Sequence, residues 1–342
     1  MRSQIYLSQG QIQAAINDLL QVEKKRPAMA SFLLAVAYAS LQDSTHTFFY
    51  LEKNLNSSFK VPKNTIWQEK AFKFLYNTPK WKKLWEKEWY SHYEYYEGEM
   101  RYLFEAENWT GIINMMADAG HDSRRLSAHA YYMTGIAYMQ LENYAAALTN
   151  FNIALSKAKK EAQYYAARGR CYLHMKNYSK ALNDFATAIQ WSPELPANYL
   201  QYALALMGLK KNESAFEVTL TLSQLFPNNR EILYTHARVS YLTKRYLQAL
   251  TSVNQLLNQV PEDSAYLHLR AMCYSQTSMF PQALKDYERL LHKYPNQPIF
   301  LLERGNIYFQ IKDKQRACND WKQSAQMGNL PASQLLWENC SQ

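Results

Sequence analysis

Long apolar runs, glycine and proline are all scarce in this chain of 342 residues. No run of 18 apolar residues occurs, so we expect no transmembrane segment. Nine glycines and eleven prolines are too few for a fold that consists mainly of β-turns and loops. The composition, 48% apolar and 20% charged, still suffices to bury a core. We therefore expect an all-helical protein.

Motifs for catalysis or metal binding are also missing. The eight histidines form no H-x-x-x-H or H-E-x-x-H pattern, and no cysteine pair has the spacing of zinc ligands. No G-x-x-x-x-G-K-[ST] phosphate loop occurs. Carboxylates such as Asp184, Glu217 and Asp286 fall on predicted helices, where we expect them to face solvent. We predict that the protein is not an enzyme and uses no cofactor, metal or small-molecule substrate.

What the chain does contain is a 34-residue repeat. A small residue recurs from Gly135, an alanine recurs from Ala147, and proline recurs from Pro193. Large side chains recur from Tyr138 and Phe151 with some lapses. Six units without insertion run from about residue 128 to 331. The small residues that continue the first two series are Gly169, Ala203, Ala237, Ala271 and Gly305, and Ala181, Ala215, Ala249, Ala283 and Ala317.

Each unit predicts two helices joined by a short polar turn. The small residue in the first helix and the alanine in the second let the helix axes approach closely, and the large residues fill the remaining space. A proline ends the second helix because it cannot donate the next backbone hydrogen bond. One unit cannot bury its apolar face alone, so neighbouring units must stack.

These positions resemble the tetratricopeptide repeat, and Tyr131, Tyr165 and Tyr199 agree with its preference for a large ring at the fourth place. The resemblance implies a right-handed α-solenoid of stacked helix-turn-helix repeats, here with a C-terminal capping helix. It also implies a concave groove, lined by the first helices, that binds a peptide. Carried onto this sequence, the groove residues are Tyr132, Ile136, Met139, Gln140, Arg170, His174, Leu204, Met207, Tyr234, Arg238, Tyr241, His268, Met272, Asn306, Phe309 and Gln310.

The predicted groove is apolar and contains methionine at its centre, with Arg170 and Arg238 on either side. Such a surface suits an extended or helical peptide that offers apolar anchors and a carboxylate. The Lys/Asn set with which chaperone-binding members of the family clamp a terminal carboxylate is not evident. We therefore predict a scaffold for protein–protein interaction. The alternative is a nucleic-acid-binding repeat protein, which the lack of recurring base-reading residues disfavours.

The repeats divide the chain into five segments. Residues 1–55 hold two repeats, of which the first lacks its opening residues, so we expect the chain to start inside a helix. Residues 56–92 form an insertion, residues 93–127 a degenerate repeat, residues 128–331 the six regular repeats, and residues 332–342 the capping helix.

The insertion is basic and aromatic. Between Lys53 and Lys87 it holds nine lysines against two glutamates, within a chain of net charge +9. One interpretation is a patch for an acidic peptide, nucleic acid or an anionic surface, the last implying peripheral membrane association. The other is a structural joint whose rings pack inward while the lysines stay in water. The stretch "FKFLYNTPKWKKLW" resembles a joint in bacterial, Bacteroidetes-type members of the family, which favours the second interpretation.

The four cysteines fall into two classes. Cys171 and Cys273 precede the repeat tyrosine and are three units apart, too far for a disulfide, so we expect buried thiols. Cys318 and Cys340 lie at equal distances from Asn329, where the chain turns back, so an antiparallel hairpin would bring them level. A disulfide there would indicate an oxidising compartment. We expect a periplasmic or outer-envelope protein that serves a bacterial envelope assembly, with a cytoplasmic one as the alternative.

Overall fold

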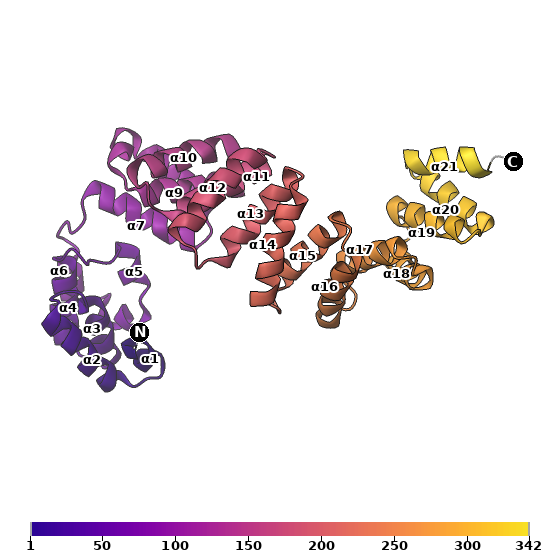
Figure 1. Ribbon diagram of the computed structural model, residues 1–342. Coiled ribbons are helices and arrows are strands. Elements are labelled where there is room, and N and C mark those ends of the chain that lie inside the picture. The colour runs from indigo at the N-terminus through magenta and orange to yellow at the C-terminus, as the bar shows by residue number, and fades with distance from the viewer. Residues whose placement is uncertain (1, 341–342) are drawn as a thin grey trace. The chain divides into compact units, whose positions relative to one another are not determined.

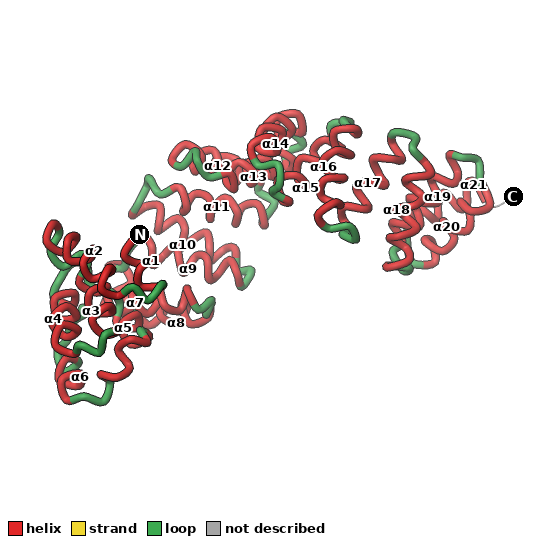
Figure 2. Tube along the Cα trace, turned by 90° about the horizontal axis from the view of Figure 1, so that it is seen from below, coloured by secondary structure: helices red, strands yellow, loops and turns green. Residues whose placement is uncertain are grey.

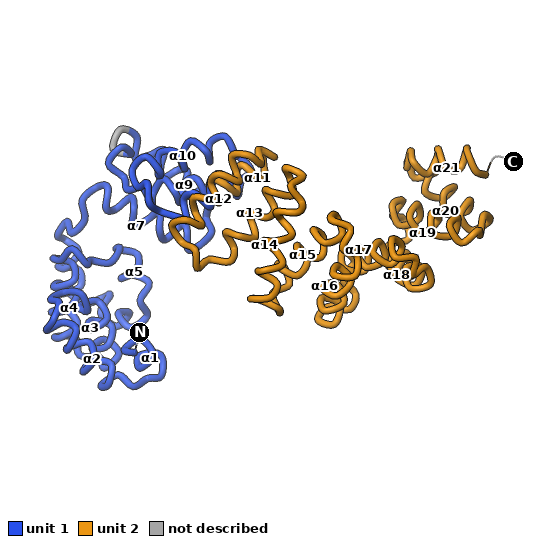
Figure 3. The backbone as a smooth tube through the Cα atoms, in the orientation of Figure 1, with its two compact units in different colours: residues 1–167 blue, residues 168–342 orange. Residues whose placement is uncertain are grey.

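The computed structural model describes residues 2–340, with only the backbone for residues 121 and 122. The regular elements in this range are all helices, and no strand occurs among them (Figures 1 and 2). The chain divides into two compact units, residues 1–167 and residues 168–342 (Figure 3). The all-helical repeat fold predicted from the sequence is thus confirmed.

Unit 1 combines helix pairs with a segment of short helices. Two of these are 3-10 helices, η1 and η2. The bounds in unit 1 are α1 (Arg2–Ser8), α2 (Ile12–Lys25), α3 (Ser31–Ser40), α4 (Ser44–Leu55), α5 (Lys63–Gln68), η1 (Lys70–Leu75), α6 (Pro79–Leu84), α7 (His92–Glu105), α8 (Trp109–Asp118), η2 (Gly120–Arg125), α9 (Ala128–Gln140) and α10 (Tyr144–Lys157).

Unit 2 consists of regular pairs and a final single helix. Its first helix, α11, begins in unit 1, because the limit between the units falls inside it. The bounds are α11 (Ala162–His174), α12 (Tyr178–Trp191), α13 (Pro196–Gly208), α14 (Asn212–Leu225), α15 (Arg230–Leu242), α16 (Tyr246–Gln259), α17 (Ser264–Gln276), α18 (Phe280–Lys293), α19 (Pro298–Gln310), α20 (Lys314–Gln326) and α21 (Leu330–Cys340).

The two helices of a pair touch where the small residue recurs. A Cβ atom added to Gly135 would lie 2.5 Å from a ring carbon of Phe151, which is fully buried. At the other end of the repeats, a Cβ on Gly305 would lie 2.7 Å from the indole of Trp321. Glycine is required at these places because a large ring of the second helix occupies the space that a side chain would need.

The turn between the helices of a pair keeps one geometry throughout the regular repeats. One residue in each turn has a left-handed backbone, with φ between 57° and 65°. The next residue donates its backbone N–H to a carbonyl near the end of the first helix, as Asn143 does to Tyr138 at 2.8 Å and Arg245 to Ser240 at 2.7 Å. The same turn in every unit explains why the sequence period never slips. The left-handed residues are Glu142, Lys176, Lys210, Lys244, Ser278 and Lys312.

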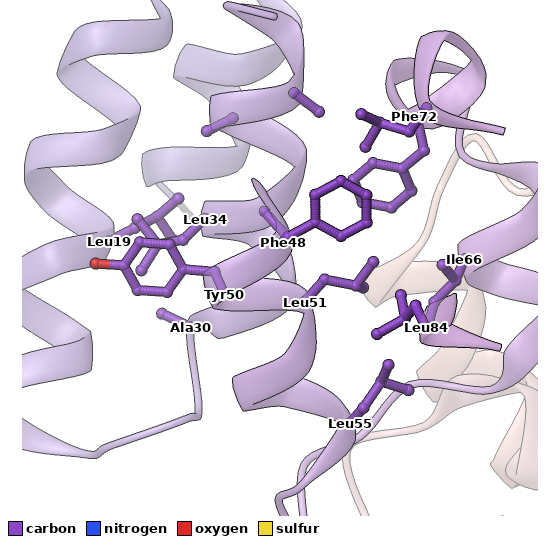
Figure 4. Packing of buried hydrophobic residues seen from close by; sticks show 14 of the residues in the cluster. Leu19, Ala30, Leu34, Phe48, Tyr50, Leu51, Leu55, Ile66, Phe72 and Leu84 are labelled. Carbon is purple, nitrogen blue, oxygen red and sulfur yellow. The ribbon is translucent and has the colours of Figure 1, made fainter. Parts of the chain in front are cut away.

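The insertion packs onto α4 through its rings. Phe72 of η1 and Trp81 of α6 are both essentially buried, and their ring centroids are 6.0 Å apart. The ring centroid of Phe48 of α4 lies 6.4 Å from that of Trp81. Figure 4 shows the ring of Phe72 directed toward that of Phe48. These contacts agree with a structural joint. Trp67 and Phe74 remain 40% exposed beside the lysines, so the segment also keeps a basic, partly aromatic surface.

The last helix covers the end of unit 2. Cys318 of α20 and Cys340 of α21 are joined in a disulfide, with their Cα atoms 5.8 Å apart. Ala332 is buried in a cluster with Trp321. The helix begins at Leu330, slightly before the predicted capping segment, because the side chain of Asn329 accepts the backbone N–H of Ala332 and caps it.

The other two cysteines lie in the core of the repeats. Cys171 of α11 and Cys273 of α17 are both 0% exposed. Burial raises the pKa of the Cys171 thiol to about 11 and that of Cys273 to about 12. At neutral pH both therefore stay protonated and unreactive.

Candidate functional site

The predicted groove residues all lie on the first helices of their repeats, and they are distributed over both units. Helix α9 of unit 1 carries Tyr132, Ile136, Met139 and Gln140. In unit 2, the others lie on α11 (Arg170, His174), α13 (Leu204, Met207), α15 (Tyr234, Arg238, Tyr241), α17 (His268, Met272) and α19 (Asn306, Phe309, Gln310).

A pocket of about 290 Å³ between α15 and α17 brings five of these residues together. The helices are consecutive first helices, so their side chains face one another across the gap between two repeats. The residues that line the pocket are Tyr234, Arg238, Tyr241, Leu242, Ala265, His268, Leu269 and Met272.

The walls of the pocket are apolar and aromatic. Leu269 is 6% exposed and forms part of the core, whereas Leu242 is 48% exposed. The ring of Tyr234 lies 5.2 Å from that of Tyr266, centroid to centroid, which fixes one wall. Burial raises the pKa of Tyr241, so its phenol is neutral at neutral pH. An apolar side chain of a ligand would find both a rigid wall and the flexible Met272 here.

Arg238 provides the positive charge of the pocket. Its guanidinium carbon lies 5.7 Å from the centre of the Tyr234 ring, and the side chain is exposed. Among residues 2–340, no carboxylate forms an ion pair with it. The pocket can therefore accept a carboxylate next to an apolar group.

His268 is held from the neighbouring repeat. Its Nε2 lies 2.5 Å from Oε2 of Glu303 on α19, and Tyr287 donates its hydroxyl to the same oxygen at 2.8 Å. The ring also lies 5.0 Å from that of Phe300. Glu303 is a site residue that the sequence analysis missed. It lies 35 residues after His268, one place beyond the exact counterpart Leu302, so a search of equivalent places on adjacent first helices would have missed it by one residue.

Three predicted groove residues are largely used by the fold itself. Ile136 is only 6% exposed, so little of its side chain is available to a ligand. Tyr132 packs between other rings, with its centroid 5.0 Å from that of Tyr164. Asn306 accepts a hydrogen bond from the Trp321 indole at 3.0 Å.

The prediction that second-helix carboxylates face solvent is wrong for two of the three named. Asp184 is 5% exposed and Asp286 is 2% exposed, whereas Glu217 is exposed as expected. Arg168 donates two N–H groups to Asp184, at 2.8 and 2.7 Å. The pairing allows burial because a guanidinium matches both carboxylate oxygens.

The same pair recurs in unit 2, as Arg270 with Asp286 and as Arg304 with Asp320. Each arginine is 16 residues before its aspartate, and the pairs keep the register of the repeat. The recurrence is visible in the sequence as an arginine followed 16 residues later by an aspartate.

The described part of the chain contains neither a candidate metal site nor a candidate membrane-spanning helix. No group of three or more His, Cys, Asp or Glu side chains there could hold a metal ion. None of the described helices has a long enough apolar stretch to cross a bilayer.

Comparison with known proteins bears on the whole chain. The family model described as "Tetratricopeptide repeat" matches residues 1–45, 132–199 and 274–333, just over half of the sequence. No sequence match was found among curated proteins.

Several solved structures share the fold at low sequence identity. A tetratricopeptide repeat protein from Parabacteroides merdae is 20% identical, with a TM-score of 0.52 over 72% of this chain and 97% of its own. The C-terminal part of a repeat protein from Cytophaga hutchinsonii is 18% identical, with a TM-score of 0.54 over 69% and 97%. PilW, a type IV pilus biogenesis factor, is 17% identical, with a TM-score of 0.53 over 62% and 97%.

Proposed function

The chain belongs to the tetratricopeptide repeat family, and on that premise we propose that it is a non-catalytic scaffold that binds a peptide segment of a partner protein. The segment would lie along the first helices of unit 2. One observation carries this proposal, namely the pocket between α15 and α17 with its apolar walls and its exposed arginine. The family resemblance implies a groove along six successive first helices, whereas the pocket selects one place between two of them.

The chemistry of the pocket specifies the ligand class. An apolar side chain would enter between Leu242 and Met272, and a carboxylate on the same segment would pair with Arg238. An arginine that has no carboxylate of its own can make a charge-assisted hydrogen bond to such a ligand without breaking an existing pair. We therefore expect peptides with a large apolar residue close to Asp, Glu or a C-terminus.

Selection from a random-peptide display library tests the proposal. The full chain is the bait, and peptides are then assayed on Met272→Glu and Arg238→Glu variants. Met272→Glu places a charge against the apolar anchor, so we expect it to weaken binding at least tenfold. Arg238→Glu should lower the affinity for peptides that carry an acidic residue, because it replaces the positive charge of the pocket with a negative one.

The matched control is Lys285→Glu, which makes the same change of charge as Arg238→Glu on the exposed face of α18. It should leave the affinities unchanged. Peptides that bind all three variants equally would rule out this pocket as the site.

For the setting, we propose an oxidising compartment, the periplasm or outer envelope, where the protein would serve an envelope assembly. The support is the pairing of Cys318 with Cys340, since stable disulfides are rare in reducing compartments. Protein isolated from its native host, then denatured and alkylated without reductant, should show Cys171 and Cys273 as its alkylated cysteines. Four alkylated cysteines would argue for the cytoplasm.

A further inference from the structure

In two consecutive repeats, a long side chain of the second helix donates a hydrogen bond to the loop that precedes the first helix of the same repeat. Gln255 of α16 donates its Nε2 to the carbonyl of Pro227 at 2.5 Å. Arg289 of α18 donates an Nη2 to the carbonyl of Pro261 at 2.9 Å. The two donors occupy the same place in successive repeats, and so do the two prolines, so this is one device used twice.

One repeat earlier, the equivalent residue of α14 is too short for this role. Thr221 takes the place of Gln255 there, and its hydroxyl donates to the carbonyl of Glu217 in its own helix at 3.1 Å. The loop at Pro193, the counterpart of Pro227, therefore has no such bridge from Thr221. A pocket of about 560 Å³ lies between this loop and α14.

The pocket is apolar inside. Leu222 is 5% exposed, Phe226 is 37% exposed, and Leu225 projects into solvent with 66% of its surface exposed. Its apolar lining consists of Pro193, Pro196, Tyr199, Val218, Leu222, Leu225 and Phe226. A surface leucine this exposed, next to a concave apolar site, is typical of places that receive another apolar group.

The charged residues that line the pocket are both acidic. Glu194 of the loop and Glu217 of α14 are exposed, and the residues that line the site include no basic one. The charge of the site is thus opposite to that of the chain as a whole, which is +9. An occupant that complements both features has a large apolar group beside a positive charge.

We propose that this pocket is a second binding site, which receives a bulky apolar side chain of a partner protein next to a lysine or arginine. It shares no residue with the pocket between α15 and α17 and is formed by a second helix and a loop. Its ligand carries the opposite charge. The inference therefore goes beyond the proposed peptide groove and does not depend on it.

Two small molecules that share a phenyl ring but differ in charge test the site, with binding followed by ligand-observed NMR. Because 3-phenylpropionate also fits the groove pocket beside Arg238, binding at the present site is measured as the part that the Thr221→Gln variant removes. For that part we expect 2-phenylethylammonium to bind about fivefold more tightly than 3-phenylpropionate, the preference that a rim of two exposed carboxylates would give. The Thr221→Gln variant introduces the bridge of Gln255 into this repeat. It should abolish binding of the cation, and it should fold, since Thr221 is exposed.

Further variants separate the outcomes. Glu194→Gln combined with Glu217→Gln should remove the preference for the cation but keep weak binding of both rings. Met272→Glu, in the groove pocket, should weaken any binding of 3-phenylpropionate there and leave the binding of the cation that Thr221→Gln removes unchanged. Equal binding of the cation to the wild type and to Thr221→Gln would overturn the proposal. Failure of the cation to bind would overturn it as well, and so would a preference for phenylpropionate in the part of the binding that Thr221→Gln removes.

Discussion

His236 stands where three other repeats of unit 2 have an arginine. The arginines Arg168, Arg270 and Arg304 are in register with it, and Ser252 takes the place of the paired aspartate. The histidine is 4% exposed, and its Nδ1 lies 3.2 Å from the hydroxyl of Thr219. Burial lowers the pKa of His236, because a charged imidazole would be poorly solvated there.

The buried histidine at this place predicts that the protein loses stability in acid. The unfolded histidine binds a proton near pH 6.5, whereas the folded one does so only at a lower pH. Between these two pKa values the unfolded state holds the extra proton. The free energy of unfolding therefore falls by up to about 1.4 kcal/mol for each unit by which the pH is lowered. The loss begins as the pH drops below about 6.5 and stops below the folded pKa.

Urea unfolding of the wild type and of His236→Gln at pH 7.5 and pH 5.5 measures the effect. The wild type should lose more stability than the variant between the two pH values. Any constant cost of the substitution cancels in this difference, and the other histidines are common to both proteins. Equal losses would mean that His236 is not the responsible group.

At the scale of the helix pair, the buried Arg–Asp pairs tie a first helix to its second helix. Arg270 donates to both oxygens of Asp286 at 2.7 Å and also to Asn254 of the preceding helix at 3.1 Å. Replacing Asp286 by alanine would leave this guanidinium, 19% exposed, without its carboxylate. We expect a loss of about 3 kcal/mol in the free energy of unfolding.

A second ion pair in the same unit serves as control. Glu213 is 70% exposed and accepts from Arg245 at 2.8 Å, so Glu213→Ala should cost less than about 1 kcal/mol. Both variants can be followed by chemical denaturation with circular dichroism. Similar losses of unfolding free energy for Asp286→Ala and Glu213→Ala would contradict the role assigned to the buried pair.

The helix pairs and their period could be predicted from the sequence because they depend on residue size at fixed spacing. Gly135 and Phe151 show this, since a glycine on one helix and a ring on the next, at a spacing that recurs, indicate a close helix contact. The buried Asp184 could not be found by the same reasoning, because a carboxylate on a second helix is usually solvated. Only its arginine partner makes burial possible.

Part of the candidate site could also be predicted from the sequence. The family resemblance predicts Tyr234, Arg238 and Met272 as groove residues, and the structure brings the three into one pocket. Ile136, predicted in the same way, is nearly covered, because position within a repeat does not determine how deeply a side chain is buried. The pocket at Thr221 lies where the hydrogen bond that Gln255 makes to Pro227 has no counterpart, and residue spacing alone does not predict side-chain hydrogen bonds.

At the scale of the whole molecule, contacts join helices that are close in sequence. Pairs such as α15 with α16 and α16 with α17 account for most of the packing. Stability in such a chain is nearly a sum of neighbouring interfaces. A local change should therefore stay local, and the terminal helix needs support of its own.

Removing the staple at α21 tests this view. The variant with both Cys318 and Cys340 changed to serine loses a link that closes a loop over a sequence separation of 22 residues, which we expect to cost about 3 kcal/mol locally. Amide hydrogen exchange should become faster in α21 and the adjoining turn of α20, because Trp337 and Leu330 contribute little packing at 77% and 79% exposure. Exchange in α3 and α4 should not change. Adding a reductant to the variant is the control and should have no effect, while faster exchange throughout the chain would show that the molecule unfolds as one cooperative body.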